Sequence, residues 1–465
     1  MPCRDFGVEE VNRVHFIGVG GVGMSGIASV CHKMGMQVSG SDLKDSRYVR
    51  ALVEEGVDVT IGHAAENVTR ANPDVVVASS AIPPTNPEIV AAKEAGIPIW
   101  RRAKMLAYVC QGYKLIAVAG THGKTTTSSC TAASLVRLGA DPTFLVGGTV
   151  DEFGSNARYG AGEYCVIEAD ESDGSFTYYD PYIAIITNIE EDHLDHYLGI
   201  EDIRAAFGDF ISEIPEDGCV IACCDCDGVE QTVRSSTKAH VITYGFSEDA
   251  DVVVRPQGDG SFETTLPGGK VVHGRMPNNP GVHNMLNASA VITALVQLGY
   301  DPDLAAQTVS QFGGVRRRFD LVGEAKGITV VDDYGHHPNE IAATLKAAKA
   351  MGYKRIHVLF QPHRYTRTQA LAEKFGPAFD DADKVTVMDV YSAGETPIPG
   401  VTGKTVVDSV LAHDPDKDIS WVQGRSEVVP YLLDTLEPGD LLMTMGAGDV
   451  TSIGPEIIAS LEGED

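Results

Sequence analysis

The chain lacks the features that mark membrane, secreted or nucleic-acid-binding proteins. None of its apolar runs approaches the ~20 residues that span a bilayer, and Met1–Glu10 shows no basic start followed by an apolar stretch, so we expect no signal peptide. Basic residues are scarce, because 36 Lys and Arg face 65 Asp and Glu, giving a net charge of −29. This balance predicts no binding to nucleic acid or membranes, and a polyanionic ligand must be held by local groups.

The cysteines do not show the spacing of a disulfide framework or of a metal site. Of the nine cysteines, Cys219, Cys223, Cys224 and Cys226 cluster, but they lack paired C-x-x-C spacing and a nearby pair of histidines. A metal or redox role is therefore disfavoured. Reduced thiols are typical of the cytosol, so we expect a cytoplasmic protein.

The strongest local pattern is a strand, a glycine turn and a helix near residue 120. Leu115–Ala119 is short and apolar, Gly120 and Gly123 follow, and a helical pattern runs from Lys124 to about Leu138 and stops at Gly139. In such a turn backbone amides and the helix N-terminus bind phosphates, the lysine reaches the outer phosphates, and Thr125 can hold Mg²⁺. The first glycine is closer to the second than in the usual phosphate loop. An ordinary turn with a surface lysine is the alternative.

A second glycine turn lies near the start of the chain. Val14–Gly18 and Gln37–Gly40 read as strands around Gly18-Val-Gly-Gly-Val-Gly23, with Asp42 just past the second strand. Taken alone, this pattern favours NAD, although any nucleotide diphosphate can use the same amides and carboxylate. A further buried strand, Asp74–Ile82, contains Ser79 and Ser80, whose hydroxyls suit ligand contact at a strand end.

Carboxylates crowd the end of another predicted strand. Tyr164–Ile167 is followed by Glu168-Ala-Asp-Glu-Ser-Asp173, which places four carboxylates in six residues. Mg²⁺ takes one or two carboxylates with phosphate and water, so this segment predicts a metal ligand, against the alternative of a solvated acidic loop. A further strand, Ile183–Asn188, precedes His193, and residues 251–275 read as antiparallel hairpins.

The last third of the chain alternates strands and helices, which predicts a doubly wound parallel sheet. Its expected strands are Thr329–Asp333, Arg355–Phe360, Lys384–Tyr391, Ile419–Val422 and Asp440–Thr444. The first two strands run into His- and Arg-containing segments, 332–338 and 361–368. Side chains at these strand ends are candidates for ligand binding. A phosphate loop in one domain and such groups in another suggest a site assembled by domain closure.

Together these segments resemble the Mur ligases, in the right order along the whole chain. The resemblance rests on eight segments: 18–26, 119–127, 168–173, 187–193, 283–287, 315–320, 332–338 and 361–368. It implies three α/β domains, which we expect at residues 1–109 (Rossmann-like, UDP-binding), 110–315 (a P-loop ATPase with a parallel sheet plus a small antiparallel sheet) and 316–465 (Rossmann-like, doubly wound, amino-acid-binding). The short glycine turn before Lys124 is the family's own form, and the first glycine loop would hold UDP rather than NAD.

The resemblance also implies substrates and roles. Within the family, Tyr334-Gly-His-His and Pro362-His-Arg-Tyr are more similar to the branch that adds L-alanine to UDP-N-acetylmuramate than to the branch that recycles peptides. The cofactors implied are ATP and Mg²⁺, and the protein would be a bacterial monomer or homodimer. Some Mur ligases hold Mg²⁺ with a carbamylated lysine, but no lysine lies between Lys124 and Lys238 here.

The residues implied fall into five groups. The catalytic group is Lys124, His193, His336 and Arg364. ATP would be bound by Gly120, Thr121, His122, Gly123, Lys124, Thr125, Thr126, His283, Asn287, Arg318 and Asp333. The UDP-sugar would be bound by Gly20, Gly21, Val22, Gly23, Ser41, Asp42, Ser79 and Ser80. The amino acid would be bound by Tyr334, His336, His363, Arg364 and Arg367, and Mg²⁺ by Thr125, Glu168 and His193.

Two other classes of function stay open at this point. A nucleotide-gated protein could bind a UDP-sugar without chemistry, and a dehydrogenase could use the first glycine loop for NAD. The acidic segment at Glu168 and the basic segment from Arg364 to Arg367 favour an enzyme over the first alternative. Binding of NADH would favour the second.

Overall fold

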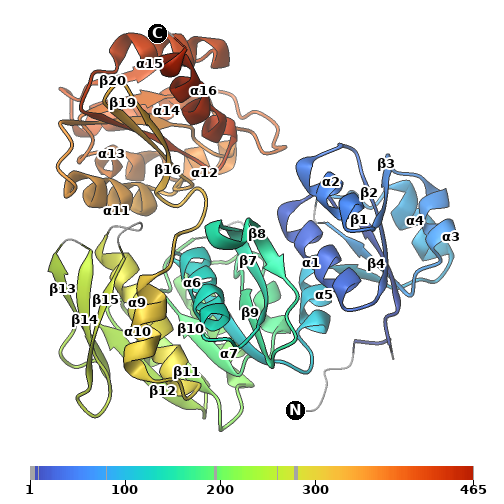
Figure 1. Ribbon diagram of the computed structural model, residues 1–465. Helices are drawn as coiled ribbons and strands as arrows, with labels where there is room; N and C mark the ends of the chain where they lie inside the picture. The colour runs from blue at the N-terminus through green and yellow to red at the C-terminus, as the bar shows by residue number, and fades with distance from the viewer. Residues whose placement is uncertain are drawn as a thin grey trace. The chain divides into compact units, whose positions relative to one another are not determined.

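The computed structural model describes residues 6–8, 10–79, 81–192, 196–258, 260–276 and 281–463. Three separate sheets follow one another along the chain, so the predicted three-part α/β architecture is confirmed (Figure 1). Contacts group the chain into two compact units. The first comprises Met1–Gln257, Ser261–Arg275 and Leu286–Gly313, and the second comprises Gly258–Gly260, Met276–Met285 and Gly314–Asp465. The boundaries near residues 110 and 315 stay a prediction.

The first sheet has five parallel strands in the order β3-β2-β1-β4-β5. Its strands are β1 (Arg13–Ile17), β2 (Gln37–Asp42), β3 (Asp58–Ile61), β4 (Val75–Ala78) and β5 (Ile99–Arg101). The helices between and after them are α1 (Val22–Lys33), α2 (Arg47–Glu54), α3 (Ala65–Ala71), α4 (Pro87–Glu94) and α5 (Arg102–Val109). Since parallel strands end at one edge, the residues after β1 to β4 share the edge at which open α/β sheets usually bind ligands.

The central sheet has ten strands in the order β15-β14-β13-β12-β11-β10-β6-β9-β7-β8. They are β6 (Lys114–Ala119), β7 (Thr143–Val150), β8 (Ser155–Arg158), β9 (Tyr164–Glu168), β10 (Ile183–Ile186), β11 (Cys219–Cys223), β12 (His240–Gly245), β13 (Val252–Gly258), β14 (Ser261–Thr265) and β15 (Val271–Arg275). The helices are α6 (Lys124–Arg137), α7 (Ile200–Ser212), α8 (Val229–Ser236), α9 (Val282–Gln297) and α10 (Pro302–Ser310). The expected antiparallel hairpin is present as β14–β15.

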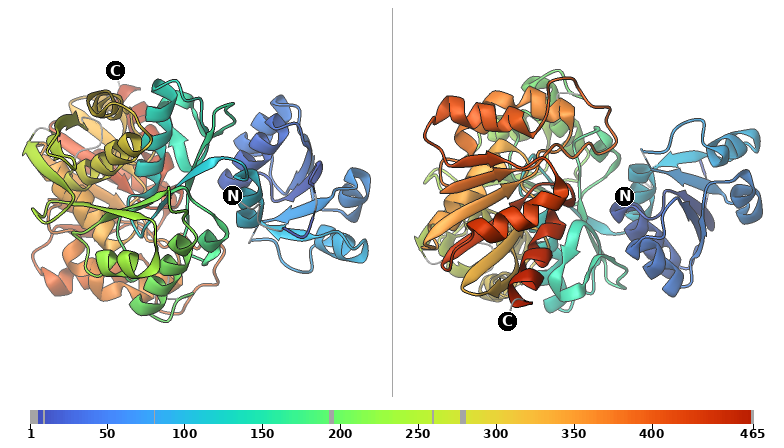
Figure 2. Two further views of the ribbon diagram at one scale, coloured as in Figure 1. Left: turned by 90° about the horizontal axis from the view of Figure 1, so that it is seen from below. Right: turned by 90° about the horizontal axis from the view of Figure 1, so that it is seen from above.

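The third sheet has six strands in the order β16-β17-β21-β18-β19-β20. They are β16 (Asp320–Ala325), β17 (Ile328–Asp333), β18 (Arg355–Phe360), β19 (Lys384–Val387), β20 (Ile419–Trp421) and β21 (Asp440–Met445). The helices are α11 (Pro338–Lys349), α12 (Tyr365–Ala370), α13 (Phe375–Ala378), α14 (Gly403–His413), α15 (Arg425–Thr435) and α16 (Ile453–Glu462). Residues of α11, α13 and α14 join one apolar cluster and residues of α15 and α16 join another, so the sheet is covered on both faces, as Figure 2 shows.

Several sequence-based expectations about strands were wrong in detail, among them the end of β10, which stops at Ile186 rather than at Asn188. Strand β16 was missed, because its six residues include Asp, Gly and Glu, and it pairs antiparallel with β17. Strand β4 ends at Ala78 and the chain turns there, with the amide of Ile82 donating to the carbonyl of Ser79 at 3.0 Å. Strand β19 ends at Val387, whereas Tyr391 forms only an isolated bridge with His363. Asp42 is the last residue of β2 rather than the residue after it.

Candidate functional site

The phosphate loop between β6 and α6 is built by close backbone approach. Gly120 and Gly123 have φ of 139° and 84°, a region that favours glycine. A Cβ at Gly120 would collide with the hydroxyl of Thr187, and one at Gly123 would lie 3.0 Å from Oδ1 of Asn287. The amide of His122 also donates to Oδ1 of Asn188 at 2.8 Å. The predicted residue Asn287 therefore lies against the loop, and Thr187 and Asn188 are supports that the sequence analysis assigned no role.

Lys124 is buried at the start of α6 and all three of its ammonium hydrogens have acceptors. Nζ donates to the carbonyls of Gly120 at 2.6 Å and Thr121 at 3.2 Å, and to Oε1 of Glu171 at 2.9 Å. Burial opposes the charge, but Glu171 and two further carboxylates outweigh it and raise the pKa of Lys124. The lysine is therefore a charged group held within the loop.

The side-chain oxygens of Thr125 and Glu168 lie together near this lysine. The Thr125 hydroxyl donates to Oε2 of Glu168 at 2.8 Å, and the amide of Gly147 donates to the same oxygen at 3.0 Å. In the described residues no cluster of three or more His, Cys, Asp and Glu could hold a metal. Mg²⁺ is commonly bound by one or two protein oxygens together with phosphate and water, so the pair fits the predicted ion. His193, the third predicted ligand, lies outside the described residues.

A cavity of about 340 Å³ joins the first glycine loop to these carboxylates. Of the predicted UDP-sugar residues, it is lined by Gly21, Val22, Gly23 and Ser79. From the central sheet it is lined by Gly147, Asn156, Glu168 and Asp170, among others. The sequence analysis missed Arg102, Gly147 and Asn156, which also line it. The structure thus brings Gly21, Ser79 and Glu168 to one cavity, although Glu168 lies 147 residues after Gly21 and 89 residues after Ser79 in the chain.

Two predicted UDP-sugar residues, Ser41 and Asp42, support the first loop from behind. The amide of Gly20 donates to Oδ2 of Asp42 at 2.9 Å, and the carbonyl of Ser41 accepts the amides of Gly18 at 2.9 Å and Val19 at 3.1 Å. The Ser41 side chain is buried, and its hydroxyl donates to Oε2 of Glu88 at 2.6 Å. The hydroxyl of Ser41 is thus committed to the protein. Ser80 lies outside the described residues.

Glu88, which the sequence analysis also missed, is a fully buried carboxylate at the start of α4. Besides Ser41, it accepts a hydrogen bond from Nδ2 of Asn67 at 2.5 Å, and its Oε2 lies 3.3 Å from Nδ1 of His63 and 3.9 Å from Nε2 of His15. Burial raises its pKa, but these donors outweigh burial and hold the pKa at about 2. A charged group is therefore part of the interior beneath the first loop.

The second compact unit gathers the predicted amino-acid residues around a row of rings. The ring centroids of Tyr334 and His336 are 5.4 Å apart, those of His336 and His363 are 5.6 Å apart, and His363 stacks on Tyr391 at 5.7 Å. The guanidinium of Arg318 lies 5.2 Å from the Tyr334 ring. Four predicted residues are thus neighbours within this unit, and Tyr391 joins them.

Burial shifts the pKa values of three predicted site residues in this unit. Burial raises the pKa of Asp333 to about 6, although Arg318 and the amides of Phe319 and Gly335 favour its ionised form. Burial also lowers the pKa of His336 to about 4 and that of His363 to about 4. At neutral pH both imidazoles are therefore neutral, and each has one ring nitrogen that can accept a hydrogen bond.

The two predicted arginines follow β18. Arg364 has φ of 67°, which is unusual for a residue with a side chain, and its amide donates to the carbonyl of Tyr391 at 2.8 Å. Arg367 lies on α12, and its charge contributes to lowering the pKa of both His336 and His363. The remaining predicted ATP residue of this unit, His283, lies in the first turn of α9.

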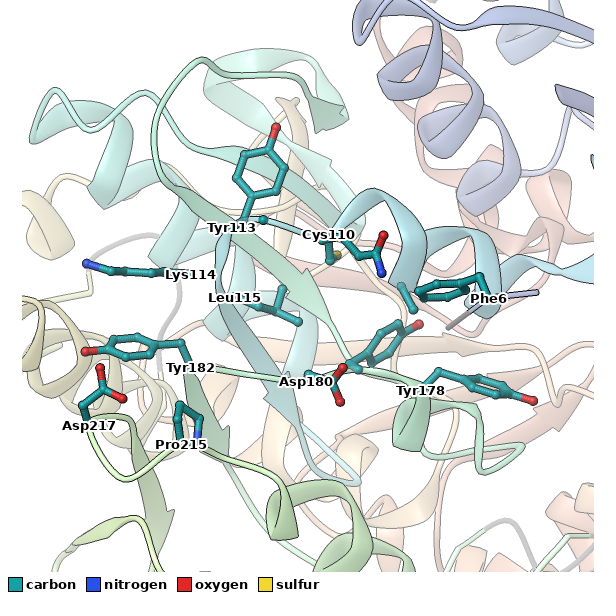
Figure 3. Close-up of a pocket in the computed structure, with 14 residues that line it drawn as sticks. Phe6, Cys110, Tyr113, Lys114, Leu115, Tyr178, Asp180, Tyr182, Pro215 and Asp217 are labelled. Carbon is teal, nitrogen blue, oxygen red and sulfur yellow. The ribbon is translucent and has the colours of Figure 1, made fainter. Parts of the chain in front are cut away.

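A second cavity, of about 410 Å³, lies elsewhere in the first unit. Figure 3 shows Phe6, Tyr113, Tyr178 and Tyr182 around it, with Asp180 nearby. It adjoins the amino ends of β6 and β10, whereas the phosphate loop follows the carboxyl end of β6. No predicted site residue lines it.

Comparison with known proteins supports the sequence resemblance along the whole chain. Residues 13–114 match the Mur ligase family, catalytic domain; residues 118–295 match the Mur ligase middle domain; and residues 317–448 match the Mur ligase, glutamate ligase domain. In the described residues no helix is both long and apolar enough to cross a membrane.

Relatives of similar length share much of the sequence. A UDP-N-acetylmuramate–L-alanine ligase from Geobacter sp. (strain M21) is 46% identical over 461 residues, which are 97% of this chain and 98% of that protein. One with the same name from Paenarthrobacter aurescens (strain TC1) is 43% identical over 471 residues, covering 100% of both chains.

Solved structures share the fold. A UDP-N-acetylmuramate-alanine ligase from Thermotoga maritima has a TM-score of 0.80 at 28% identity, covering 98% of this chain and 100% of that chain. A murein peptide ligase from Psychrobacter arcticus has a TM-score of 0.72 at 26% identity, covering 96% of this chain and 98% of that chain. With three matched domains and full-length relatives above 40% identity, the chain belongs to the Mur ligase family.

Proposed function

We propose that this chain joins L-alanine to the lactyl carboxylate of UDP-N-acetylmuramate, using ATP and releasing ADP and phosphate, in the synthesis of peptidoglycan precursors. The observation that carries the proposal is the cavity shared by the first glycine loop and Glu168, next to Lys124 and Thr125. A ligase needs the substrate carboxylate and the γ-phosphate to meet, and this arrangement offers a binding loop for each. The names of the full-length relatives support the same reaction.

The chemistry follows from the charges. A carboxylate oxygen attacks the γ-phosphorus and ADP leaves, which gives an acyl phosphate; the alanine amine then attacks the acyl carbon, loses a proton, and phosphate leaves. Two anions must approach in the first step, so its barrier is largely electrostatic. Lys124 neutralises the outer phosphates, and Gly120 to Thr126 bind them through the loop. Thr125, Glu168 and His193 are the candidates to hold Mg²⁺, which supplies further neutralising charge when bound.

Recognition of L-alanine is assigned to the second unit. Arg367 and His363 bind the alanine carboxylate, and Tyr334 and His336 border the amine, with Arg364 beside them. With a pKa of about 4, His336 is neutral at pH 7, so it borders the amine without adding a positive charge beside it. Arg318, Asp333 and His283 are retained as further ATP-binding residues, and Gly20 to Gly23, Ser41, Asp42, Ser79 and Ser80 as the UDP-sugar set. The cysteines described are free, which fits a reducing, cytoplasmic location.

The test is phosphate release with ATP and Mg²⁺ when single components are omitted. Release that needs both UDP-N-acetylmuramate and L-alanine supports the ligase. Equal release without either substrate would reduce the protein to an ATPase, and binding without any turnover would support a nucleotide-gated binding protein. Tight binding of NADH would favour a dehydrogenase.

A peptide-recycling ligase is the second candidate, because the murein peptide ligase from Psychrobacter arcticus shares the fold. Replacing L-alanine with the peptide that such an enzyme attaches discriminates the two. Turnover with the peptide and none with L-alanine would assign the chain to the recycling branch.

A further inference from the structure

Tyr391 holds three consecutive residues of the segment that follows β18. It pairs with His363 in an isolated parallel bridge. In this bridge its amide donates to the carbonyl of Pro362 and its carbonyl accepts the amide of Arg364, each at 2.8 Å. Arg364 has φ of 67°, a backbone conformation that costs free energy in a residue with a side chain. The bridge therefore keeps the segment in a conformation that Arg364 by itself disfavours.

The ring of Tyr391 lies nearly parallel to the imidazole of His363. Their centroids are 5.7 Å apart and their planes differ by 12°, whereas the ring of His336 meets the same imidazole at 63°. Among the described residues, Nδ1 of His363 is buried and has no hydrogen-bond partner, while Nδ1 of His336 lies 3.1 Å from the carbonyl of Tyr334. A hydrogen bond can thus orient His336, but contacts with neighbouring rings orient His363.

The loop after β21 packs against Tyr391. A Cβ built at Gly448 would lie 2.7 Å from Cγ and 2.8 Å from Cβ of Tyr391, so this close approach requires glycine. The same loop is fixed by the side chain of Gln361. Its Oε1 accepts the amide of Val450 at 3.1 Å, and its Nε2 donates to Oδ1 of Asp449 at 2.7 Å. The Tyr391 ring therefore has little room to turn away from the imidazole on which it stacks.

The surroundings of His363 favour its neutral form. The charged and titratable groups that face it are His336, Arg364, Arg367 and Glu395. Burial is the largest cause that lowers the pKa of His363 to about 4; the other imidazole and the two arginines act in the same direction, and the carboxylate opposes them. Loss of the Tyr391 ring should admit water to the imidazole and raise the pKa of His363 toward its ordinary value of 6.5.

We infer that Tyr391 is a positioning residue of the amino-acid site: its ring fixes the imidazole of His363, and its carbonyl fixes the backbone of Arg364. The inference rests on the proposed function, in which His363 and Arg367 bind the alanine carboxylate. Alanine offers few contacts, so its binding depends on groups that are in place before it arrives. Tyr391 acts through His363 and not by contact with the substrate.

The experiment compares the full chain with Tyr391→Ala, Tyr391→Leu and Tyr391→Phe in steady-state kinetics, with L-alanine, ATP and UDP-N-acetylmuramate varied in turn. We expect Tyr391→Ala to raise the KM for alanine about tenfold, the effect of weakening one hydrogen bond to a charged group, with nearly unchanged KM values for the other two substrates. Tyr391→Leu keeps apolar bulk without a flat ring and should behave alike. Tyr391→Phe keeps the ring and should resemble the wild type. The matched control is Tyr353→Ala, at a partly buried tyrosine before the amino end of β18.

The pH dependence supplies a readout that a general structural defect would not move. An imidazolium attracts a carboxylate more strongly than a neutral imidazole does. If loss of the ring raises the pKa of His363, the ratio of the alanine KM in Tyr391→Ala to that in the wild type should fall between about pH 8 and about pH 6. An NMR titration of the histidine rings, with the His363 signal identified by its loss in His363→Gln, measures the same pKa without turnover.

The outcomes separate this inference from the proposed function. An unchanged KM for alanine in both Tyr391→Ala and Tyr391→Leu overturns the inference, and so does a Tyr391→Phe protein as impaired as Tyr391→Ala, because the hydroxyl rather than the ring would then matter. A rise in all three KM values with an unchanged titration of His363 also overturns it, since the substitution would then disturb the unit as a whole. A wild type without ligase turnover counts against the proposed function, whereas the titration of His363 still tests its contact with Tyr391.

Discussion

The first compact unit contains two strand–glycine loop–helix segments that share a backbone plan and differ in charge. After β6, the phosphate loop carries its own cation, Lys124, which is bonded to two carbonyls of the loop and to Glu171. After β1, the first loop has no lysine, and the amide of Gly20 is taken by the carboxylate of Asp42. The nearest arginine, Arg102, comes from a different helix.

The difference shows that glycine spacing specifies a phosphate-sized turn but not the chemistry of the ligand. A loop with a buried lysine, a hydroxyl and carboxylates at the next strand can bind a triphosphate with a metal ion and transfer its outer phosphate. A loop without them can bind a diphosphate and position it. The sequence alone left NAD open for the first loop, because the glycines are compatible with either ligand.

The largest effect is expected for Lys124→Ala. The substitution removes the charge that neutralises the outer phosphates, so kcat should fall on the order of 10²-fold or more. Steady-state phosphate release measures kcat, and binding of UDP-N-acetylmuramate should persist because the first loop is intact. The control is Lys33→Ala, which removes an exposed lysine paired with Glu55. Near-normal turnover in folded Lys124→Ala would place ATP elsewhere.

A smaller and selective effect is expected for Gly21→Val. The backbone of Gly21 has φ of −71° and ψ of 145°, and a Cβ there would meet only ordinary contacts, the closest at 3.7 Å. The side chain would therefore enter the space of the ligand without a clash at Cβ. We expect at least about a tenfold rise in the KM for UDP-N-acetylmuramate, since one charged hydrogen bond is already worth that much.

Binding of ATP should not change in Gly21→Val, because the phosphate loop is a separate segment. Gly313→Ala is a matched control, since a Cβ at Gly313 has no neighbour within 4 Å. If ATP affinity falls with UDP-sugar affinity, the two loops are not independent and the comparison between them fails.

A third expected effect contrasts both loops with the second unit, where side chains rather than loop amides are assigned to the ligand. Arg367→Lys keeps the charge and loses the planar fork that can meet a carboxylate with two hydrogen bonds. A methyl group is worth only about 1 kcal/mol, so the carboxylate must position alanine. We expect the KM for alanine to rise about tenfold while the KM values for ATP and UDP-N-acetylmuramate stay nearly unchanged.

Steady-state kinetics with each substrate varied in turn measures this effect. Arg425→Lys, at an arginine paired with Glu456, is the control. A raised KM for ATP with an unchanged KM for alanine would move Arg367 to the nucleotide.

The sequence predicted the strands and glycine loops well because their signals are local. Strand β18 has the predicted bounds, and β6 and α6 each differ from the prediction by one residue. A short apolar run and a glycine that needs positive φ are visible within ten residues. The order of the motifs then extended the prediction to the family.

The supporting residues could not be predicted in the same way. Asn156 donates to the carbonyl of Val22, 134 positions away, at 3.3 Å, and no local pattern connects the two. Arg102 follows another arginine after a strand, and Glu88 follows a proline at a helix start, so each reads as an ordinary surface residue. Their partners are set by sheet order and by the packing of distant elements, which the local sequence does not encode.

The smallest expected effect concerns the buried carboxylates behind the two loops. Glu171 accepts a hydrogen bond from Lys124, for which we propose a role in catalysis, whereas Glu88 faces Ser41, Asn67 and two histidines, for which we expect a structural role. Glu88→Gln keeps the shape but turns an amide toward one of these donors. We expect the free energy of unfolding at pH 7 to fall by about 1–3 kcal/mol, the cost of an unsatisfied buried group.

The pH dependence gives a second measure of Glu88. The pKa of this carboxyl is about 2 in the folded protein, below its ordinary value of 4.5. Its contribution to stability is therefore present above about pH 4.5 and is lost as the pH falls toward 2. Urea unfolding at pH 7 and at pH 3.5 should show a smaller difference between wild type and Glu88→Gln at the lower pH. Exposed Glu66→Gln is the control. Equal stability of wild type and Glu88→Gln at pH 7 would show that the Glu88 carboxylate does not support the first loop. The contrast between Glu88 and Glu171 would then depend only on the hydrogen bond of Glu171 with Lys124.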